Sequence, residues 1–312
     1  MQSIQAKALD RTEPSYKQKK YRWNDALWGY LFIAPSFIIL VVFNFYPVLS
    51  GLGISLTSWN MLSDPKFIGL GNYSRLVSDP IVPKIVWNTV YYTFLSVPLN
   101  IIFSLGLAMA LNQRIRGISF FRTAYYLPVV SASVAVSMIW MWILAENGIL
   151  NFTLNAIGIN PISWLGDPKI ALTSITLVNV WKNLGFNIII FLAALQDVPP
   201  ELKDAAKVDG ANSVGIFKHV TLPMISPAIL FTTMMGVIGS FQAFDLVYNM
   251  TFKHEGGPAR STSVIGFYIW QNAFRYSKMG YAAALAYALF IFIMILTLLQ
   301  WRARRLWVFG EE

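Results

Sequence analysis

The sequence predicts an all-α integral membrane protein with six transmembrane helices. Of its 312 residues, 56% are hydrophobic and only 12% are charged, and the mean hydropathy is +0.53. A soluble domain of this length needs about twice that share of charged residues, roughly 25%, to cover its surface. The apolar residues also form long blocks, and a helix of about 20 apolar residues is enough to cross a bilayer.

Six apolar blocks predict spans near residues 27–51, 85–111, 124–145, 170–195, 225–250 and 281–301. Counts of five or seven spans remain open. Residues 149–165 are apolar enough for a seventh, but three asparagines and Pro161 interrupt them, which favours a short interfacial helix. The first block could also belong to a signal peptide, but it exceeds the roughly 7–15 apolar residues of a typical signal core, so an uncleaved anchor is favoured.

Lysine and arginine are distributed unequally between the two sides of this arrangement. With the N-terminus inside, fifteen fall in inside segments and eight in outside loops, and Lys182 lies within a span. This bias predicts that both termini are cytoplasmic. The predicted organisation is a cytoplasmic tail over 1–26, a transmembrane domain over 27–301 and a cytoplasmic tail over 302–312. The net charge of +9 then reflects topology, and no separate basic module predicts a nucleic-acid partner.

The composition also excludes several kinds of chemistry. There is no cysteine, so disulfides, thiolate metal sites and cysteine nucleophiles are absent. The only histidines, His219 and His254, are predicted on opposite sides of the membrane. No glycine-rich run ends in Gly-Lys-Ser/Thr, so the chain carries no nucleotide-binding P-loop. We therefore expect no catalytic, cofactor-binding or metal-binding residues in this chain, and no enzymatic activity.

A long polar stretch, PPELKDAAKVDGANSVGIFKHVTLP over residues 199–223, interrupts the two apolar blocks on either side. Its prolines end the fourth span and start a short helix, because proline suits only the first turn. Gly210 is placed to stop that helix in a left-handed conformation. A second short helix is predicted from Ala211 through Val220, and Pro223 then leads into the fifth span.

Together with Asp197 just before it, the stretch is acidic for a cytoplasmic loop, since four carboxylates (Asp197, Glu201, Asp204 and Asp209) outnumber three lysines. A loop that rests on anionic lipid is expected to be basic. It is therefore either a solvated connector or an element that docks on a basic surface of another protein.

The residues Glu201-Leu202-Lys203-Asp204-Ala205-Ala206, followed by Asp209-Gly210-Ala211, Phe217 and Thr221-Leu222-Pro223, resemble the "EAA" loop of bacterial ABC importer permeases. In that family the loop is the coupling helix that enters a cleft of the ATPase subunit. The resemblance implies that this role falls on Glu201, Asp204, Ala205, Ala206, Asp209, Gly210, Phe217, Leu222 and Pro223. One residue departs from the pattern: Asp204 stands where glutamate is usual, which keeps the charge and shortens its reach.

Motifs elsewhere resemble the carbohydrate-uptake branch of that family, related to the maltose permeases. They include Trp181-x-x-x-Gly185-Phe186, Ala193-Ala194-Leu195-Gln196, Phe244-Asp245 and Gly256-Gly257-Pro258. The resemblance implies a type I ABC importer permease fold in a bacterial cytoplasmic membrane. It also implies a second homologous permease subunit, an ABC ATPase dimer, an extracytoplasmic solute-binding protein and a sugar, polyol or glycerol phosphate as substrate.

Polar residues inside spans are costly and usually face protein or a water-filled path. In the fourth span three asparagines repeat every four residues, and in the fifth span Gln242, Asp245 and Asn249 are spaced as one helical face. Amides and carboxylates can bind sugar hydroxyls, and Trp181, Phe241, Phe244 and Tyr248 offer aromatic faces. The candidate pathway residues are Asn179, Lys182, Asn183, Asn187, Gln242, Asp245, Tyr248 and Asn249. The alternative is that these faces join helices to one another.

A possible ion pair, a group of small residues and two prolines within the spans lead to further expectations. Lys182 and Asp245 lie at different depths, about 10 Å apart along the membrane normal, so a direct ion pair is not favoured. Gly236, Gly239 and Ser240 suit close helix packing, within the chain or against a partner. Pro47 and Pro98 mark bends of the first and second spans, by default static kinks.

Two rival functions stay open at this stage. An ion-gradient-driven secondary transporter is expected to show inverted repeats and broken helices near the midplane, and the sequence reveals neither. A membrane-embedded enzyme is weaker still, because the predicted spans lack histidine, cysteine and clustered carboxylates.

Overall fold

The computed structural model describes residues 23–113, 117–251 and 256–309, which form two compact units, Met1–Gly51 and Leu52–Glu312. The first unit holds helix α1 (Trp23–Leu40), a π-turn η2 (Val41–Phe45) and the start of α2 (Tyr46–Ser55). The backbone N–H of Tyr46 donates to the carbonyl of Val41, five residues back. This wider turn lies directly before Pro47, whose ring does not fit a regular α-helical ladder.

Residues 26–55 form an apolar helix long enough to span a membrane, and none of its most apolar window is buried. Large side chains such as Leu31 and Phe32 are 57% and 78% exposed. A fully apolar, fully exposed helix requires a lipid or protein environment. The first predicted span is therefore confirmed as a span-length helix. Most of the predicted tail 1–26 lies outside the described residues, and the helix already begins at Trp23.

Three further spans are single long helices, as predicted. They are α4 (Val82–Leu111), α8 (Ala171–Gln196) and α15 (Met279–Ala303). Helix α4 runs unbroken through Pro98. All three are long and apolar enough to cross a membrane. Together with the first unit they give four continuous candidate spans among the described residues.

The third and fifth predicted spans are broken, so the expectation of one regular helix in each was wrong. Helices α5 (Ile118–Val130) and α6 (Ser133–Ile143) meet at an angle of 107°. The fifth block consists of α12 (Ser226–Phe241) and α13 (Asp245–Met250), separated at residues 242–244. A second bend, of 65°, precedes α12. If each bent pair is one span, the described residues contain six.

Short elements connect these helices. Residues 149–165 form only one short helix, α7 (Ile149–Ala156), which agrees with a short helix and not a seventh span. A two-stranded antiparallel sheet of β1 (Thr57–Ser58) and β2 (Lys66–Phe67) pairs Thr57 with Phe67. The remaining elements are α3 (Gly71–Ser78), α9 (Pro200–Val208), α10 (Ser213–Ile216), η3 (Phe217–Thr221), α11 (Leu222–Met224), η5 (Pro258–Arg260), α14 (Ile265–Trp270), η6 (Gln271–Arg275) and η7 (Arg304–Leu306).

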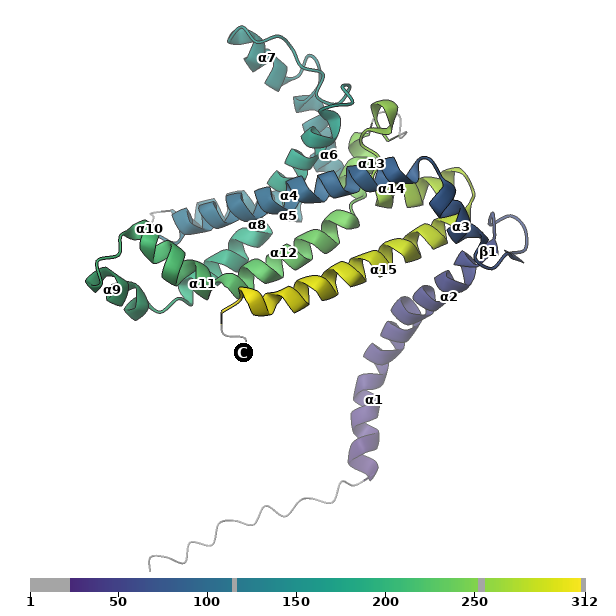
Figure 1. Ribbon diagram of the computed structural model, residues 1–312, viewed down its shortest axis with the longest axis horizontal. Helices are drawn as coiled ribbons and strands as arrows, with labels where there is room; N and C mark the ends of the chain where they lie inside the picture. The colour runs from purple at the N-terminus through teal and green to yellow at the C-terminus, as the bar shows by residue number, and fades with distance from the viewer. Residues whose placement is uncertain (1–22, 114–116, 252–255, 310–312) are drawn as a thin grey trace, which may run out of the picture. The chain divides into compact units, whose positions relative to one another are not determined.

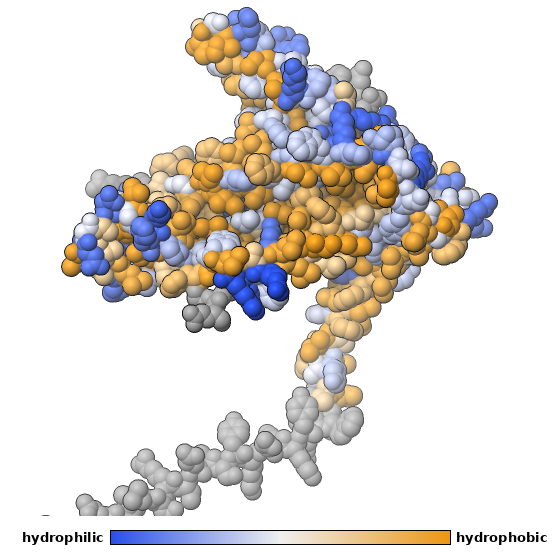
Figure 2. All heavy atoms as spheres, in the orientation of Figure 1, coloured by the Kyte–Doolittle hydropathy of each residue, from blue (hydrophilic) through white to orange (hydrophobic). Residues whose placement is uncertain are grey.

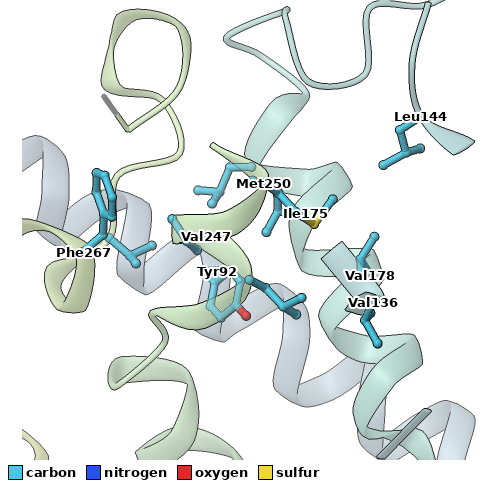
Figure 3. Packing of buried hydrophobic residues seen from close by; sticks show 11 residues of the cluster. Tyr92, Val136, Leu144, Ile175, Val178, Val247, Met250 and Phe267 are labelled. Carbon is cyan, nitrogen blue, oxygen red and sulfur yellow. The ribbon is translucent and has the colours of Figure 1, made fainter. Parts of the chain in front are cut away.

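Helices α4 and α8 form the centre of the second unit, with α12 packed on α4 and α5 packed on α8 (Figure 1). The contact between α5 and α8 is close at Gly185, where a Cβ atom would lie 2.2 Å from the carbonyl oxygen of Tyr125. One apolar cluster joins α4, α8 and α13 through Tyr92, Ile175 and Val247 (Figure 3). A second cluster, around Phe191 and Ile225, lies where α8 ends and α12 begins.

The second unit has two distinct ends. Helices α9 and α10 lie at one end, beyond the last turn of α8, and β1 and α3 lie at the other (Figure 1). Apolar side chains cover the long helices between them, whereas hydrophilic residues gather at both ends (Figure 2). This distribution is what a bilayer around the middle of the helices requires.

Candidate functional site

A cavity of about 420 Å³ lies among α4, α8, α12 and α13. The broken segment 242–244 contributes part of its wall, which is consistent with irregular backbone at membrane depth lining a cavity. Helix α8 supplies four of its ten polar lining residues and α4 supplies two, while most of the apolar lining comes from α4, α12, α13 and the break. The polar and charged lining residues are Ser96, Asn100, Ser133, Asn179, Lys182, Asn183, Asn187, Ser240, Gln242 and Asp245.

Six of the eight predicted pathway residues line this one cavity. From α8 they are Asn179, Lys182, Asn183 and Asn187, and from the fifth span Gln242 and Asp245. The structure thus brings together two polar faces that lie 55 or more residues apart in the sequence.

Tyr248 and Asn249 do not line the cavity, because the helix break disrupts the spacing from which their common face with Gln242 was inferred. Tyr248 packs instead into an aromatic cluster, with ring centroids 4.7 Å from Trp270 and 5.2 Å from Phe244. Of the four predicted aromatic residues, only Phe244 reaches the cavity. Trp181 packs on Trp140, and Phe241 packs on Phe292.

Some of the polar lining residues also join helices to one another, whereas others form hydrogen bonds only within their own helix. Asn187 Nδ2 donates to Asn100 Oδ1 at 2.6 Å, and Asn100 Nδ2 donates to the carbonyl of Val180 at 3.1 Å. Asn183, by contrast, is exposed and donates only to Asn179, one turn earlier on the same helix. Asn187 therefore connects α8 to α4, whereas Asn183 lines the cavity and bonds only within α8.

The polar residues of α4 were missed by the sequence reasoning. Thr89, Thr93, Ser96, Asn100 and Ser104 recur at intervals of three or four residues, and all are buried. The Ser96 and Ser240 hydroxyls lie 3.0 Å apart and join α4 to α12. The same helical spacing that identified the α8 asparagines identifies this face.

The helices α12 and α4 approach closely at only some of the expected positions. A Cβ atom at Gly236 would lie 3.3 Å from the Val97 side chain, so Gly236 supports close packing. Gly239 has no atom within 4 Å of a Cβ position and lines the cavity instead.

The stretch 199–223 folds as two short helices joined at a left-handed glycine. Helix α9 starts with Pro200 in its first turn and stops at Gly210, whose φ is +81°. The N–H of Gly210 donates to the Lys207 carbonyl, and the N–H of Ala211 donates to the Ala206 carbonyl. This pair of bonds is the Schellman motif, which closes the carbonyl end of a helix.

The second helix begins at a side-chain cap. Asn212 Oδ1 accepts from the N–H of Gly215 at 2.8 Å, which satisfies a free donor at the first turn of α10. The helix continues through η3 and α11 and includes Pro223, and the chain turns at Ile225, two residues after Pro223.

The loop presents a continuous exposed surface, with its acidic and small residues outward. Glu201, Asp204, Ala205, Asp209 and Gly210 are exposed. Apolar side chains that the sequence reasoning did not select, Val208 and Val214, are 87% and 72% exposed. Ala206, Phe217, Leu222 and Pro223 are half-buried, and η3 packs on α9. Asp204 and Lys207 form an exposed ion pair with a Nζ–Oδ1 distance of 2.8 Å.

Neither site offers a metal centre: within residues 23–113, 117–251 and 256–309, no group of three or more His, Asp or Glu side chains could hold an ion. His254 lies outside these ranges. The chemistry available is hydrogen bonding in the cavity and protein contact at the loop.

The chain was compared with known proteins. It is 41% identical over 282 residues to the lactose transport system permease protein of Rhizobium radiobacter, covering 89% of this chain and 94% of that protein. It is 36% identical to a probable ABC transporter permease protein of Bacillus subtilis, covering 92% and 94%. It is 30% identical to the trehalose/maltose transport system permease protein of Thermococcus litoralis, covering 92% and 96%.

A solved structure shares the fold of this chain. It is the crystal structure of a bacterial alginate ABC transporter in complex with an alginate pentasaccharide-bound periplasmic protein. A chain of that complex aligns with a TM-score of 0.79 at 22% identity, covering 90% of this chain and 95% of its own length. It therefore supports the type I permease architecture.

The family model for the inner membrane component of binding-protein-dependent transport systems matches residues 84–306, a range that contains the cavity, the helix break and the loop 199–223. The protein belongs to this family of transport permeases.

Proposed function

We propose that this chain is one of two permease subunits of an ATP-driven, binding-protein-dependent sugar importer. It supplies half of the translocation pathway and a coupling helix, and a separate ATPase dimer hydrolyses the ATP. The observation that carries the proposal is the exposed α9–η3 loop, held by a Schellman stop and an asparagine cap, in a unit that also contains a polar cavity among its long helices.

A sugar fits the chemistry of the cavity. Asn179, Asn183 and Gln242 supply amide donors and acceptors, and Asp245 supplies a carboxylate, for hydroxyl groups. Phe186 and Phe244 supply apolar faces beside them. The relatives named for lactose and for trehalose/maltose support a disaccharide or oligosaccharide as the substrate.

The rest of the assembly follows from family membership. An extracytoplasmic solute-binding protein delivers the sugar to the face opposite α9, and an ATPase dimer binds α9 from the cytoplasm. The exposed apolar helix of the first unit and the apolar long helices of the second support a location in a bacterial inner membrane, and the bias of lysine and arginine supports cytoplasmic termini. We assign no enzymatic reaction to this chain itself.

The comparisons give no support to the rival secondary transporter. Family membership weighs against it, because the matching family consists of binding-protein-dependent systems.

The test is co-purification of an affinity-tagged chain from its native host in mild detergent. We expect a second permease and a soluble ATPase in the same complex, and uptake of labelled disaccharide that stops when ATP is depleted. Uptake that follows an ion gradient, with no ATPase bound, would contradict the proposal.

A further inference from the structure

A second cavity, of about 480 Å³, lies at the end of the second unit away from α9. It is formed by the end of α3, the turn before α4, helix α14 with η6, and the segment before α15. Helix α8 ends beside α9, whereas α4 and α15 begin at this cavity, so the length of the long helices separates it from the loop (Figure 1). The lining residues that matter here are Arg75, Asp79, Arg260, Tyr268 and Lys278.

The cavity carries an excess of positive charge. Its lining holds three cationic side chains, from Arg75, Arg260 and Lys278, and one carboxylate, Asp79. Asp79 is already engaged: its Oδ1 accepts from the backbone N–H of Ile81 at 2.9 Å, and its Oδ2 accepts from the hydroxyls of Tyr268 and Tyr281, each at 2.7 Å. Burial raises the pKa of Asp79, but these donors and the Arg75 guanidinium outweigh it and lower the pKa overall. Its single negative charge leaves the cavity cationic.

Arg260 lacks the partner that a buried guanidinium normally has. Its Nη1 atom is buried and has no hydrogen-bond partner. Leaving such a group unsatisfied is costly, and more so for a charged group. Arg260 also lines this cavity, in which a carboxylate would lie among two or more cations.

The backbone that carries these cations is strained. Ala259, Arg260 and Ser277, the residue before Lys278, have φ values of +51°, +59° and +51°, a region that side chains disfavour. Strained positions cost about 1–3 kcal/mol each and concentrate at functional sites. The first turns of α4 fix this segment, since Lys84 Nζ donates to the Ala259 carbonyl and Asn88 Nδ2 donates to the Arg260 carbonyl at 3.0 Å.

Exposed apolar and aromatic residues neighbour the lining residues in the sequence. Tyr276, which lines the cavity, is 39% exposed, and Val77 and Phe274, close in sequence to lining residues, are 86% and 63% exposed. Aromatic residues and arginine are enriched where proteins dock. A carboxylate surrounded by apolar surface on a partner protein would complement both the cationic cavity and the exposed apolar residues near it.

We propose that this cavity receives an acidic side chain of the solute-binding protein, with Arg260 and Lys278 binding its carboxylate. The inference rests on the proposed function, because it needs an importer whose binding protein docks opposite the ATPase. The partner contributes a glutamate or aspartate that projects from an apolar patch of its docking face.

The test uses the whole complex, with its ATPase and second permease, in lipid nanodiscs. The Arg260→Gln/Lys278→Gln double variant is compared with wild type and with Lys169→Gln, which removes an exposed cation from the segment before α8. The probe is the sugar-loaded solute-binding protein encoded with the transporter. Because two charge contacts are lost at once, we expect its Kd to rise about tenfold or more in the double variant. We expect the Kd to be unchanged in Lys169→Gln and the basal ATP hydrolysis to be unchanged in both.

A carboxylate scan of the binding protein supplies the second measurement. One Asp→Asn or Glu→Gln change on its docking face should raise the Kd as much as the double variant does, and combining the two should add little further. A Kd equal to wild type in the double variant overturns the proposal. The proposal is also overturned if wild type binds sulfate at constant ionic strength and the double variant does not, while the Kd for the binding protein is the same in both.

The outcome is separable from that of the proposed function. Suppose that wild type binds both the ATPase and the solute-binding protein, and that the double variant binds the solute-binding protein as tightly as wild type does. Only the docking proposal then fails. If wild type holds no ATPase, the importer itself is contradicted.

Discussion

At the scale of single residues, Gly210 shows how one backbone position shapes the loop. Its φ of +81° is disfavoured for a residue with a side chain, yet a Cβ atom there would meet nothing within 4 Å. A substitution therefore acts through backbone strain and not through a clash, at a cost of about 1–2 kcal/mol. Asparagine tolerates the left-handed region better than other residues do.

We expect Gly210→Val to loosen the end of α9 and to lower the amount of ATPase that co-purifies with the complex, while Gly210→Asn retains most of it. The measurement is the ratio of ATPase to permease after affinity purification in detergent. Both variants should accumulate in the membrane at the wild-type level. If Gly210→Val retains as much ATPase as wild type, Gly210 does not contribute to coupling with the ATPase.

Asp79 is a second residue whose surroundings make a measurable prediction. Its pKa is lowered in the folded protein, so its contribution to stability is present above the pKa of the unfolded chain, near 4, and is lost as the pH falls through the lower folded value. Burial first, and then the bond to Asp79, raise the pKa of Tyr268 to about 12, so its hydroxyl stays a donor at neutral pH.

Tyr268→Phe removes one of the two tyrosine donors to Asp79 and should destabilise the protein by about 1 kcal/mol at pH 7, because hydrogen bonds to charged groups exceed neutral ones. The difference from wild type should shrink as the pH falls below about 4 and through the lower folded pKa of Asp79, where the folded carboxyl becomes protonated. Thermal unfolding in detergent, measured in a series from pH 7 down to the lowest pH at which the protein stays folded, follows both. A difference that is the same at every pH of the series would show that the hydroxyl does not act through the carboxylate.

At the scale of elements, the continuous helices followed directly from the sequence, and the breaks did not. Hydropathy over residues 225–250 gives no sign of the interruption at 242–244. The cause lies in tertiary packing: a Cβ atom at Gly266 would lie 2.5 Å from the Ala243 carbonyl oxygen, so α14 packs against the open backbone of the break. A contact between segments more than 20 residues apart has no local signature.

The α8 asparagines allow the two roles of polar residues to be separated. Asn183→Ala should lower transport several-fold with an intact complex, because Asn183 faces the cavity and bonds only to its own helix. Asn187→Ala removes the donor to Asn100 Oδ1, although Asn100 Nδ2 still donates to Val180, and should lower stability by about 1–2 kcal/mol. Uptake into proteoliposomes and thermal unfolding of the same preparations compare the two. Similar profiles for the two variants would mean that the cavity face only joins helices.

Asp245→Ala extends the same comparison to the fifth span. Asp245 is exposed and lines the cavity at the first turn of α13. We expect lost uptake with normal assembly and normal basal ATP hydrolysis. Normal uptake in both Asp245→Ala and Asn183→Ala would show that neither residue takes part in the translocation pathway.

At the scale of the whole molecule, much of the site was accessible from the sequence. Six cavity residues were found from helical spacing and the loop from its residue pattern. The fold supplied the rest: after the break Tyr248 packs among aromatic residues, and α4 brings Asn100 to Asn187 of α8 and Ser96 to Ser240 of α12. Spacing identifies a face of one helix, but only packing shows what that face meets.

The distribution of lysine and arginine predicts the orientation of the whole chain. A reporter fused after residue 312 should be cytoplasmic, and one inserted near Asn155, in α7, should be external. Alkaline phosphatase and green fluorescent protein fusions distinguish the two sides. Two reporters on one side would contradict the arrangement of six crossings.

The contact between loop and ATPase is the feature on which the proposed mechanism depends. Asp204 is exposed and pairs only with Lys207 on the same helix, and an exposed pair contributes about 1 kcal/mol at most to the stability of the chain. Reversing its charge therefore acts mainly on a docked basic surface, where two like charges would be opposed. Lys207→Gln breaks the same ion pair and leaves the carboxylate in place, which makes it the matched control.

The most direct measurement is the stimulation of ATP hydrolysis by sugar-loaded binding protein in the reconstituted complex. We expect Asp204→Lys to abolish the stimulation and to weaken retention of the ATPase, with the affinity of the binding protein for sugar unchanged, while Lys207→Gln behaves close to wild type. Full stimulation and full ATPase retention by Asp204→Lys would show that the loop is only a connector between two spans.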